Sequence, residues 1–177
     1  YQDVASYKKE MMIAQLYGVE GWALNCGNWK RKDPKTGKWK PHEGYVQASS
    51  NVFAAAEALG VPVSFHPAPL PEAVQAQYFR SEALSPAVNA KLAGPGFGWH
   101  AEAGLMTIRL ILSGLFRDHP GLTILSGHWG ELVPAFLDRL DRVFPVEVTG
   151  LPETVSAYYR KHVWLTPGGI LSPVQLD

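Results

Sequence analysis

Two histidines in this sequence each follow a short apolar segment. His66 comes directly after VPVSF, and His128 comes after LTILSG. An imidazole can bind a metal ion or transfer protons near neutral pH, so both residues are candidates for chemistry. The alternative is that each is a hydrogen-bonded structural histidine. Two histidines at equivalent places, each beside tight-turn residues, favour the chemical interpretation.

Glycine lies close to His128 on both sides, in the segment SGHWGE that begins at Ser126. Such glycines permit a sharp turn from a strand into a helix. Glu131 then falls where we expect the next helix to start, and the helix dipole favours a carboxylate there. From that position Glu131 could orient His128. The spacing equally allows a carboxylate that only stabilises the helix end.

Arg139 and Arg142 alternate with Asp138 and Asp141 on the helix expected after this segment. Ion pairs between residues three positions apart explain the pattern without any function. The functional alternative for Arg139 is recognition of a substrate carboxylate by its planar guanidinium group. Spacing alone favours the ion pairs.

Helices and strands are expected to alternate along the chain. The predicted helices cover residues 6–17, 49–59, 101–116, 131–144 and 152–160, with a short one near 72–80, and the predicted strands cover 19–25, 61–65, 122–127 and the segment HVWLTPGG. This alternation predicts a parallel sheet with crossover helices. Ligands bind at the carboxyl ends of such strands, where His66 and His128 lie. The Pro- and Gly-containing segment 70–98 is expected to be a long functional loop.

The length of the chain limits the fold. A complete eight-stranded α/β barrel typically needs about 250 residues, and this chain of 177 residues offers about four βα units. The sequence therefore predicts a single α/β domain that is half of such a barrel or a smaller doubly wound sheet.

The composition favours a small-molecule enzyme. The 16 basic and 16 acidic residues cancel, which gives no reason to expect binding to nucleic acid or to an anionic membrane. The basic run from Lys30 to Lys40 contains Pro and Gly and is typical of an exposed loop, with phosphate binding as the alternative. The single cysteine, Cys26, fits a reducing cytoplasm. No stretch approaches the roughly 20 apolar residues of a membrane span.

Several ordered motifs resemble the amidohydrolase-related (amidohydrolase 2) family. The segments RLILSGLFRDHP and GHWGELVPAFLDR match its patterns RLIxSGxFxxxP and GHxGExxPxxxxR in order, upstream AAAEALGVPVSFHP matches aaExLgxPvxxHP, and downstream YYRKHVWLTPGGI is similar to yxrxNvyxTxSG. Within the family, the likeness is greatest to the nonoxidative decarboxylases of γ-resorcylate, dihydroxybenzoate and 5-carboxyvanillate. Aminocarboxymuconate semialdehyde decarboxylase is similar at a greater distance.

The resemblance implies a partial (β/α)8 TIM barrel of the metal-dependent hydrolase type, covering roughly strands 4 to 7 and incomplete at both ends. His66 would be the metal ligand after the fifth strand. His128, after the sixth strand, would transfer protons beside a zinc or manganese ion, with Glu131 supporting it. Arg139 would reach a substrate carboxylate in the neighbouring subunit, which implies a homodimer or a higher homo-oligomer.

The implied activity is nonoxidative decarboxylation of a small aromatic or cyclic carboxylic acid. A metal-dependent hydrolase of a lactone or amide and a catalytically silent fragment are the alternatives. The family's His-x-His or Glu-x-His pair of the first strand has no counterpart here, and Met106 stands where decarboxylases often carry a histidine. We expect the ligand aspartate of the eighth strand to lie beyond Asp177. Because catalytic zinc normally has three or four protein ligands, we expect the 177-residue chain alone to bind metal weakly and to be inactive.

Overall fold

The computed structural model describes residues 3–16, 30–41 and 43–169 of the chain. The chain divides into two compact units. One contains residues 1–64 with 119–123, and the other contains residues 65–118 with 124–177. The predicted strand at 19–25 lies outside the described residues.

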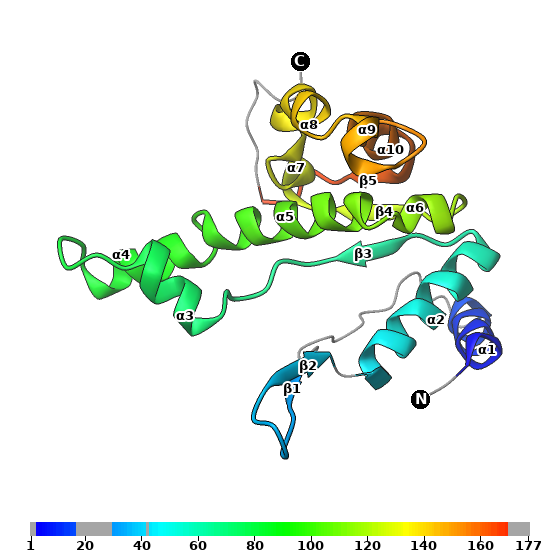
Figure 1. The fold of residues 1–177 in the computed structure, drawn as a ribbon, viewed down its shortest axis with the longest axis horizontal. Coiled ribbons are helices and arrows are strands. Elements are labelled where there is room, and N and C mark those ends of the chain that lie inside the picture. The colour runs from blue at the N-terminus through cyan, green and yellow to red at the C-terminus, as the bar shows by residue number, and fades with distance from the viewer. Residues whose placement is uncertain (1–2, 17–29, 42, 170–177) are drawn as a thin grey trace. The chain divides into compact units, whose positions relative to one another are not determined.

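Two helices form the core of the first unit. They are α1 (Val4–Leu16) and α2 (Glu43–Leu59), which pack against each other (Figure 1). Met11, Val52 and Ala55 are buried between them. The helix predicted at 6–17 is confirmed, and the helix predicted at 49–59 starts six residues earlier than expected. It ends before Gly60, which adopts a positive φ of 64°, as the glycine after a helix often does.

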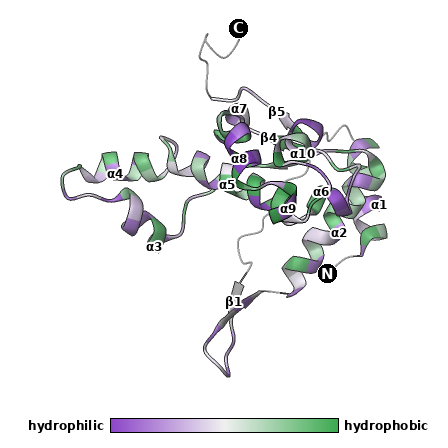
Figure 2. Ribbon diagram, turned by 45° about the horizontal axis from the view of Figure 1, so that its top comes forward, coloured by the Kyte–Doolittle hydropathy of each residue, from purple (hydrophilic) through white to green (hydrophobic). Residues whose placement is uncertain are grey.

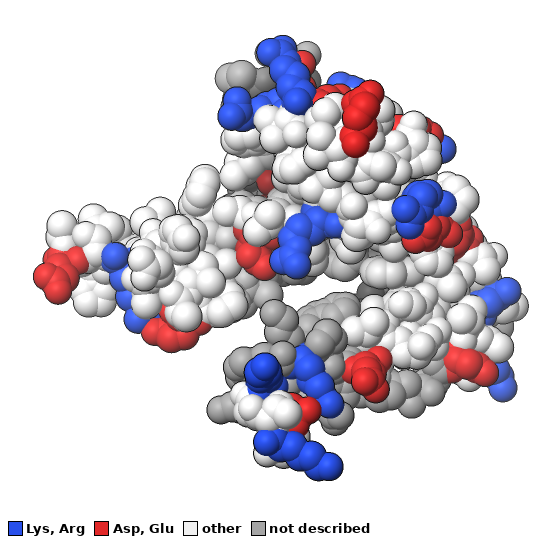
Figure 3. Space-filling view, in the orientation of Figure 1, with Lys and Arg blue, Asp and Glu red and all other residues white. Residues whose placement is uncertain are grey.

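The basic segment from Lys30 to Lys40 forms an antiparallel hairpin. Its residues 34–38 are exposed as predicted, but the segment is not an irregular loop. Strand β1 (Lys30–Lys32) pairs with β2 (Trp39–Pro41). Asp33 builds the turn, because its Oδ1 accepts hydrogen bonds from the backbone N–H groups of Lys35 at 2.8 Å and Thr36 at 3.2 Å. These bonds lower the pKa of Asp33. Basic side chains gather on this hairpin (Figure 3).

A partly buried group of hydrogen bonds in the first unit depends on Glu57 of α2. Its Oε2 accepts a hydrogen bond from His119 Nδ1 at 2.8 Å, and its Oε1 accepts one from the backbone N–H of Gly121 at 2.8 Å. The backbone N–H of Val63 also donates to the carbonyl oxygen of Thr123 at 2.9 Å. The turn 119–123, which leads into the next strand, is therefore fixed to α2.

Three strands form a sheet in the order β3–β4–β5. They are β3 (Val63–Phe65), β4 (Ile124–Ser126) and β5 (Val163–Leu165). Strands β4 and β5 pair in parallel, with Ile124 opposite Val163. All three strands lie within segments predicted to be strands. Their carboxyl ends lead directly to His66 after β3 and almost directly to His128 after β4.

The second unit also contains most of the helices. They are α3 (Glu72–Val74), the π-helix η1 (Gln75–Phe79), α4 (Pro86–Ala93), α5 (Gly98–Leu112), α6 (Leu115–Asp118), α7 (His128–Glu131), the 3-10 helix η2 (Val133–Phe136), α8 (Leu137–Val143), α9 (Val146–Thr149) and α10 (Val155–His162). Helix α10 packs against α5 and α8. Phe116 stacks on His162 with ring centroids 4.4 Å apart and on Tyr158 at 6.4 Å, and all three are buried.

Residues 70–98, predicted to be a long loop, contain regular structure beyond the expected short helix. Helix α4 follows Ser85, whose Oγ accepts a hydrogen bond from the backbone N–H of Val88 at 3.3 Å. A capping serine followed by a proline at the first helical position is a known start signal, and both residues are present in the sequence. Helices α3, η1 and α4 form an arm at one end of α5, and hydrophobic residues cover much of α4 (Figures 1 and 2).

Within the described ranges, no helix combines the length and the apolar character that crossing a bilayer requires.

We predict that Glu57→Ala destabilises the chain by about 0.5–1.5 kcal/mol, the net contribution of a typical hydrogen bond, because the partly exposed N–H groups of His119 and Gly121 lose their common acceptor. Urea unfolding followed by circular dichroism measures the change in the free energy of unfolding. The control is Ala in place of the exposed Glu82. Equal unfolding midpoints for the two variants would contradict the role of Glu57 as the acceptor that fixes the turn 119–123.

Candidate active site

The segment after β4 is a left-handed turn. Five successive residues have positive φ angles: His128 at 46°, Trp129 at 57°, Gly130 at 83°, Glu131 at 53° and Leu132 at 69°. This conformation costs an L-residue about 1–2 kcal/mol, and such strain is concentrated at functional sites. Glu131 therefore does not start a regular helix, and the helix predicted at 131–144 is confirmed only from Val133 onward, as η2 followed by α8. The turn instead brings Glu131 against His128, three residues earlier.

Gly130 allows this turn to approach its surroundings closely. A Cβ atom at Gly130 would lie 2.2 Å from the hydroxyl oxygen of Tyr159. The backbone N–H of Gly130 donates to the carbonyl oxygen of Gly127 at 2.7 Å, and that of Trp129 donates to the carbonyl oxygen of Thr166 at 2.9 Å. The turn is thus fixed to the segment that follows β5.

Helix α5 lies against the same turn through Gly104. A Cβ atom at Gly104 would lie only 2.3 Å from the backbone carbonyl oxygen of Glu131. Any side chain here would push the helix away from Glu131. Gly104 was not predicted to matter, because a single glycine inside a predicted helix does not indicate a close backbone contact.

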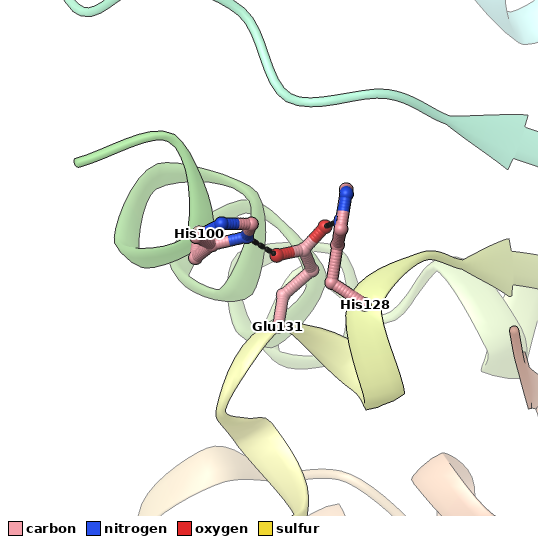
Figure 4. A group of neighbouring side chains, drawn as sticks. All are labelled: His100, His128 and Glu131. Carbon is pink, nitrogen blue, oxygen red and sulfur yellow. Dashed lines mark hydrogen bonds and ion pairs between the residues drawn. The ribbon is translucent and has the colours of Figure 1, made fainter. Parts of the chain in front are cut away.

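The Glu131 carboxylate is bound by two histidines. Its Oε1 lies 2.5 Å from Nδ1 of His128, and its Oε2 lies 2.7 Å from Nδ1 of His100. Glu131 is 3% exposed, so the two imidazoles are the groups that compensate its burial. Figure 4 shows that the rings approach the carboxylate from different sides, and that the second ring nitrogen of His128 points away from it. The predicted support of His128 by Glu131 corresponds to this contact.

His100 was not among the predicted site residues. It is the third residue of α5, 31 positions before Glu131, and the helix was predicted to start at residue 101. The rings of His100 and His128 also meet edge to face, with centroids 4.6 Å apart. A histidine at the start of a helix is an ordinary feature, so no signal in the sequence singles it out.

His66 shares a cavity with these residues. The cavity has a volume of about 380 Å³, within the range of small-molecule sites, and its lining includes His66, Phe97, Trp99, His100, His128 and Glu131. The His66 ring lies 6.3 Å from that of His128, centroid to centroid. The structure therefore brings together three of the four predicted site residues.

The ring nitrogens of His66 have different roles. Its Nδ1 lies 2.7 Å from the carbonyl oxygen of Pro67, which can only accept, so Nδ1 carries the hydrogen. In the neutral ring, Nε2 then has a free lone pair. Metal-binding histidines commonly donate their other N–H to a carbonyl or carboxylate in this way. His66 thus has the hydrogen bonding of a metal ligand.

His100, His128 and Glu131 also have potential ligand atoms within 4.8 Å of one another, a spacing that could hold a metal ion. In the structure, these atoms are joined by the two hydrogen bonds to the carboxylate. A hydrogen on Nδ1 excludes a metal ion from that nitrogen. The arrangement therefore favours a hydrogen-bonded group that leaves Nε2 of His128 available.

Arg139 does not line the cavity. It is exposed on α8, and the neighbouring Arg142 pairs with Asp138 at 2.7 Å. Asp141 instead accepts a hydrogen bond from the backbone N–H of Ser156 at 2.8 Å. Arg142 thus forms a local ion pair, but with the aspartate four positions away rather than the predicted three. The role of Arg139 in binding a carboxylate stays a prediction.

We predict that Gly104→Ala destabilises the protein by about 1–3 kcal/mol, as overpacking does, because the new methyl group meets the Glu131 carbonyl oxygen. Helix propensity alone would act in the opposite direction, since Ala stabilises a helix by about 0.5–1 kcal/mol relative to Gly. The free energy of unfolding in urea therefore distinguishes the two effects by its sign. A stabilised variant would show that α5 does not press against the turn.

Burial raises the pKa of Tyr159 to about 12, and the nearby negative charge of Glu131 acts in the same direction. In the unfolded chain, the Tyr159 hydroxyl ionises near its ordinary pKa of about 10, whereas in the folded chain it stays neutral up to about pH 12. The contribution of Tyr159 to the free energy of unfolding is therefore complete below pH 10 and is lost as the pH rises from about 10 to about 12. We expect Tyr159→Phe to reduce the loss of stability over this interval. Unfolding free energies measured across it test this, with the exposed Tyr78→Phe as control. Identical pH dependence in the wild type and Tyr159→Phe would contradict it.

Comparison with known proteins agrees with this geometry. The Amidohydrolase family matches residues 3–169. Decarboxylase orsB of Emericella nidulans is 40% identical over 88 residues, which are 50% of this chain and 26% of that protein. The γ-resorcylate decarboxylase of Rhodococcus jostii is 48% identical over 50 residues, 28% of this chain and 15% of that protein.

A solved structure shows the same likeness along most of the chain. It is a 5-carboxyvanillate decarboxylase from Novosphingobium aromaticivorans with bound manganese and 3-methoxy-4-hydroxy-5-nitrobenzoic acid. It has 26% sequence identity and a TM-score of 0.67, and the match covers 96% of this chain and 45% of that one. The chain thus spans less than half the length of this relative, and the predicted partial TIM barrel is confirmed. From these matches and from the histidines at its strand ends, we conclude that the chain belongs to the amidohydrolase family.

Proposed function

We propose that this chain carries the proton-transfer part of a divalent-metal-dependent nonoxidative decarboxylase that acts on a small aromatic carboxylic acid. The observation that carries the proposal is the placement of His128. Its Nδ1 is held by the buried Glu131, while its ring lines the cavity that His66 also lines. The decarboxylases among its relatives supply the class of reaction.

His66 is the residue that we assign to the metal. Its Nε2 lone pair suits manganese or zinc, both of which accept imidazole ligands, and a relative binds manganese. An ion held by His66 would supply positive charge that stabilises the negative charge developing on substrate oxygens.

The remaining chemistry belongs to the chain's own side chains. His128 takes up a proton on Nε2 and passes it to the ring carbon that bears the carboxylate. The bond from that carbon to the carboxylate then breaks, its electron pair restores the aromatic ring, and carbon dioxide leaves. Glu131 stabilises the imidazolium form of His128 during the transfer. Phe97 and Trp99 line the cavity and suit a flat aromatic substrate.

Two further parts of the proposal rest on the sequence. Arg139 projects from α8 as an exposed guanidinium, and we assign to it the carboxylate of a substrate bound in a neighbouring subunit, so the working form is a homo-oligomer. The single cysteine, Cys26, supports a cytoplasmic location.

The metal site can be tested on the 177-residue chain. We expect Mn²⁺ to bind weakly and to broaden the imidazole NMR signals of His66 and His128 strongly, because the ion is paramagnetic and lies beside both. His66→Ala should abolish the broadening at His128. His119, which pairs with Glu57 outside the cavity, is the internal control. Equal broadening of His119 and His66 would contradict a specific site.

The reaction requires more metal ligands than the one that we assign here, because three or four are normal. Turnover is therefore measured in a hybrid, in which residues 3–169 replace the matching segment of the 5-carboxyvanillate decarboxylase. We expect the hybrid to release carbon dioxide from 5-carboxyvanillate or 2,6-dihydroxybenzoate. His128→Ala should lower kcat by about 100-fold or more, the usual contribution of a general acid or base. Lactone hydrolysis without decarboxylation, or full activity without His128, would overturn the proposal.

A further inference from the structure

His100 occupies an unusual position for a histidine, because both of its ring nitrogens face oxygen atoms. Its Nδ1 lies 2.7 Å from Oε2 of Glu131, and its Nε2 lies 3.1 Å from the carbonyl oxygen of Pro95. The side chain is 15% exposed. The ring is therefore held between the carbonyl group of Pro95, which precedes α5, and the left-handed turn. Figure 4 shows its contact with Glu131.

The groups around His100 restrict where its ring hydrogens lie, because some of them can only accept. The carbonyl oxygen of Pro95 can only accept, so Nε2 of His100 carries a hydrogen. One more proton lies between Nδ1 of His100 and Oε2 of Glu131. It belongs either to an imidazolium beside a carboxylate or to a carboxylic acid beside a neutral ring. In both cases the pair has no net charge, which suits the burial of Glu131.

Both assignments leave Oε1 of Glu131 as an acceptor. The atom 2.5 Å from it, Nδ1 of His128, must then be the donor. In the neutral His128 ring, the hydrogen therefore lies on Nδ1, and Nε2 keeps its lone pair.

We infer that His100 is a positioning residue: by occupying Oε2 of Glu131, it fixes the hydrogen of His128 on Nδ1 and leaves Nε2 free to exchange protons with a substrate. The structural part of this inference stands on the hydrogen bonds alone. Its consequence for catalysis rests on the proposed function.

Removing His100 changes the proton arrangement. Without the His100 ring, the buried Oε2 loses its hydrogen-bond partner, and a proton on the carboxyl group is free to lie on Oε1. A hydroxyl there donates to Nδ1 of His128, which moves the hydrogen of the neutral ring to Nε2. His128 then has the tautomer that cannot accept a proton on Nε2.

The tautomer of His128 can be measured directly. Long-range ¹H–¹⁵N correlation spectra of the ¹⁵N-labelled 177-residue chain distinguish a ring hydrogen on Nδ1 from one on Nε2, and His128→Asn assigns the signals. The spectra are recorded near pH 8, above the usual imidazole pKa of about 6.5. We expect the wild-type chain to carry the hydrogen on Nδ1. We expect His100→Phe, which keeps a flat ring without donors, to shift it largely to Nε2.

Two further variants separate positioning from a general effect on folding. His100→Asn retains an amide N–H near the place of Nδ1, so it should restore the wild-type tautomer. His119→Phe removes the equivalent partner of Glu57, 2.8 Å from that carboxylate and outside the cavity, and should leave His128 unchanged. A wild-type tautomer in His100→Phe, or the same shift in all three variants, would overturn the inference.

The catalytic consequence is measured in the hybrid enzyme. We expect His100→Phe to lower kcat by about tenfold or more with little change in KM, and His100→Asn to recover most of it. Unchanged kcat in His100→Phe would contradict the catalytic role. If the hybrid decarboxylates no aromatic acid, the proposed function fails, while the tautomer measurement still decides the structural part.

Discussion

The carboxylate of Glu131 is the constraint on which the site depends. A carboxyl group that is almost fully buried needs hydrogen-bond donors, since an uncompensated polar group in a low-dielectric interior is strongly destabilising. Here its hydrogen-bond partners are two imidazoles from different parts of the sequence, His100 and His128. One carboxylate thereby ties the start of α5 to the segment after β4, and it orients the ring that faces the cavity.

The surrounding elements fit this arrangement closely. Gly104 lets α5 reach the backbone of Glu131, and Gly130 lets the turn reach Tyr159. The bond from Trp129 to Thr166 connects the turn to the end of β5, which pairs in parallel with β4. Small residues, parallel strands and a strained turn thus together fix the positions of Glu131 and His128. Together they hold the His128 ring in a fixed orientation without a long flexible loop.

The sequence predicted the parts of the site that follow local patterns. His66 and His128 were predicted because apolar runs followed by tight turns mark strand ends, and Glu131 because it lies three residues after His128. His100 was not predicted, since its partner is 31 residues away and contact at that distance depends on packing. The left-handed turn was also missed. Glycines near His128 indicated a turn, but its hand at Glu131 and Leu132 is imposed by tertiary contacts rather than by local preference.

The left-handed turn also restricts which amino acids the site can accept. Side chains branched at Cβ are the least tolerated at positive φ, and the segment HWGEL, residues 128–132, contains no Val, Ile or Thr. Evolution or design therefore has little freedom to reshape the cavity from this side. Phe97 and Trp99, which line the cavity at the start of α5, have no positive φ and are less restricted in the side chains that they can carry. One side of the cavity is thus restricted in the side chains that it accepts by its backbone conformation, and the other side is less restricted.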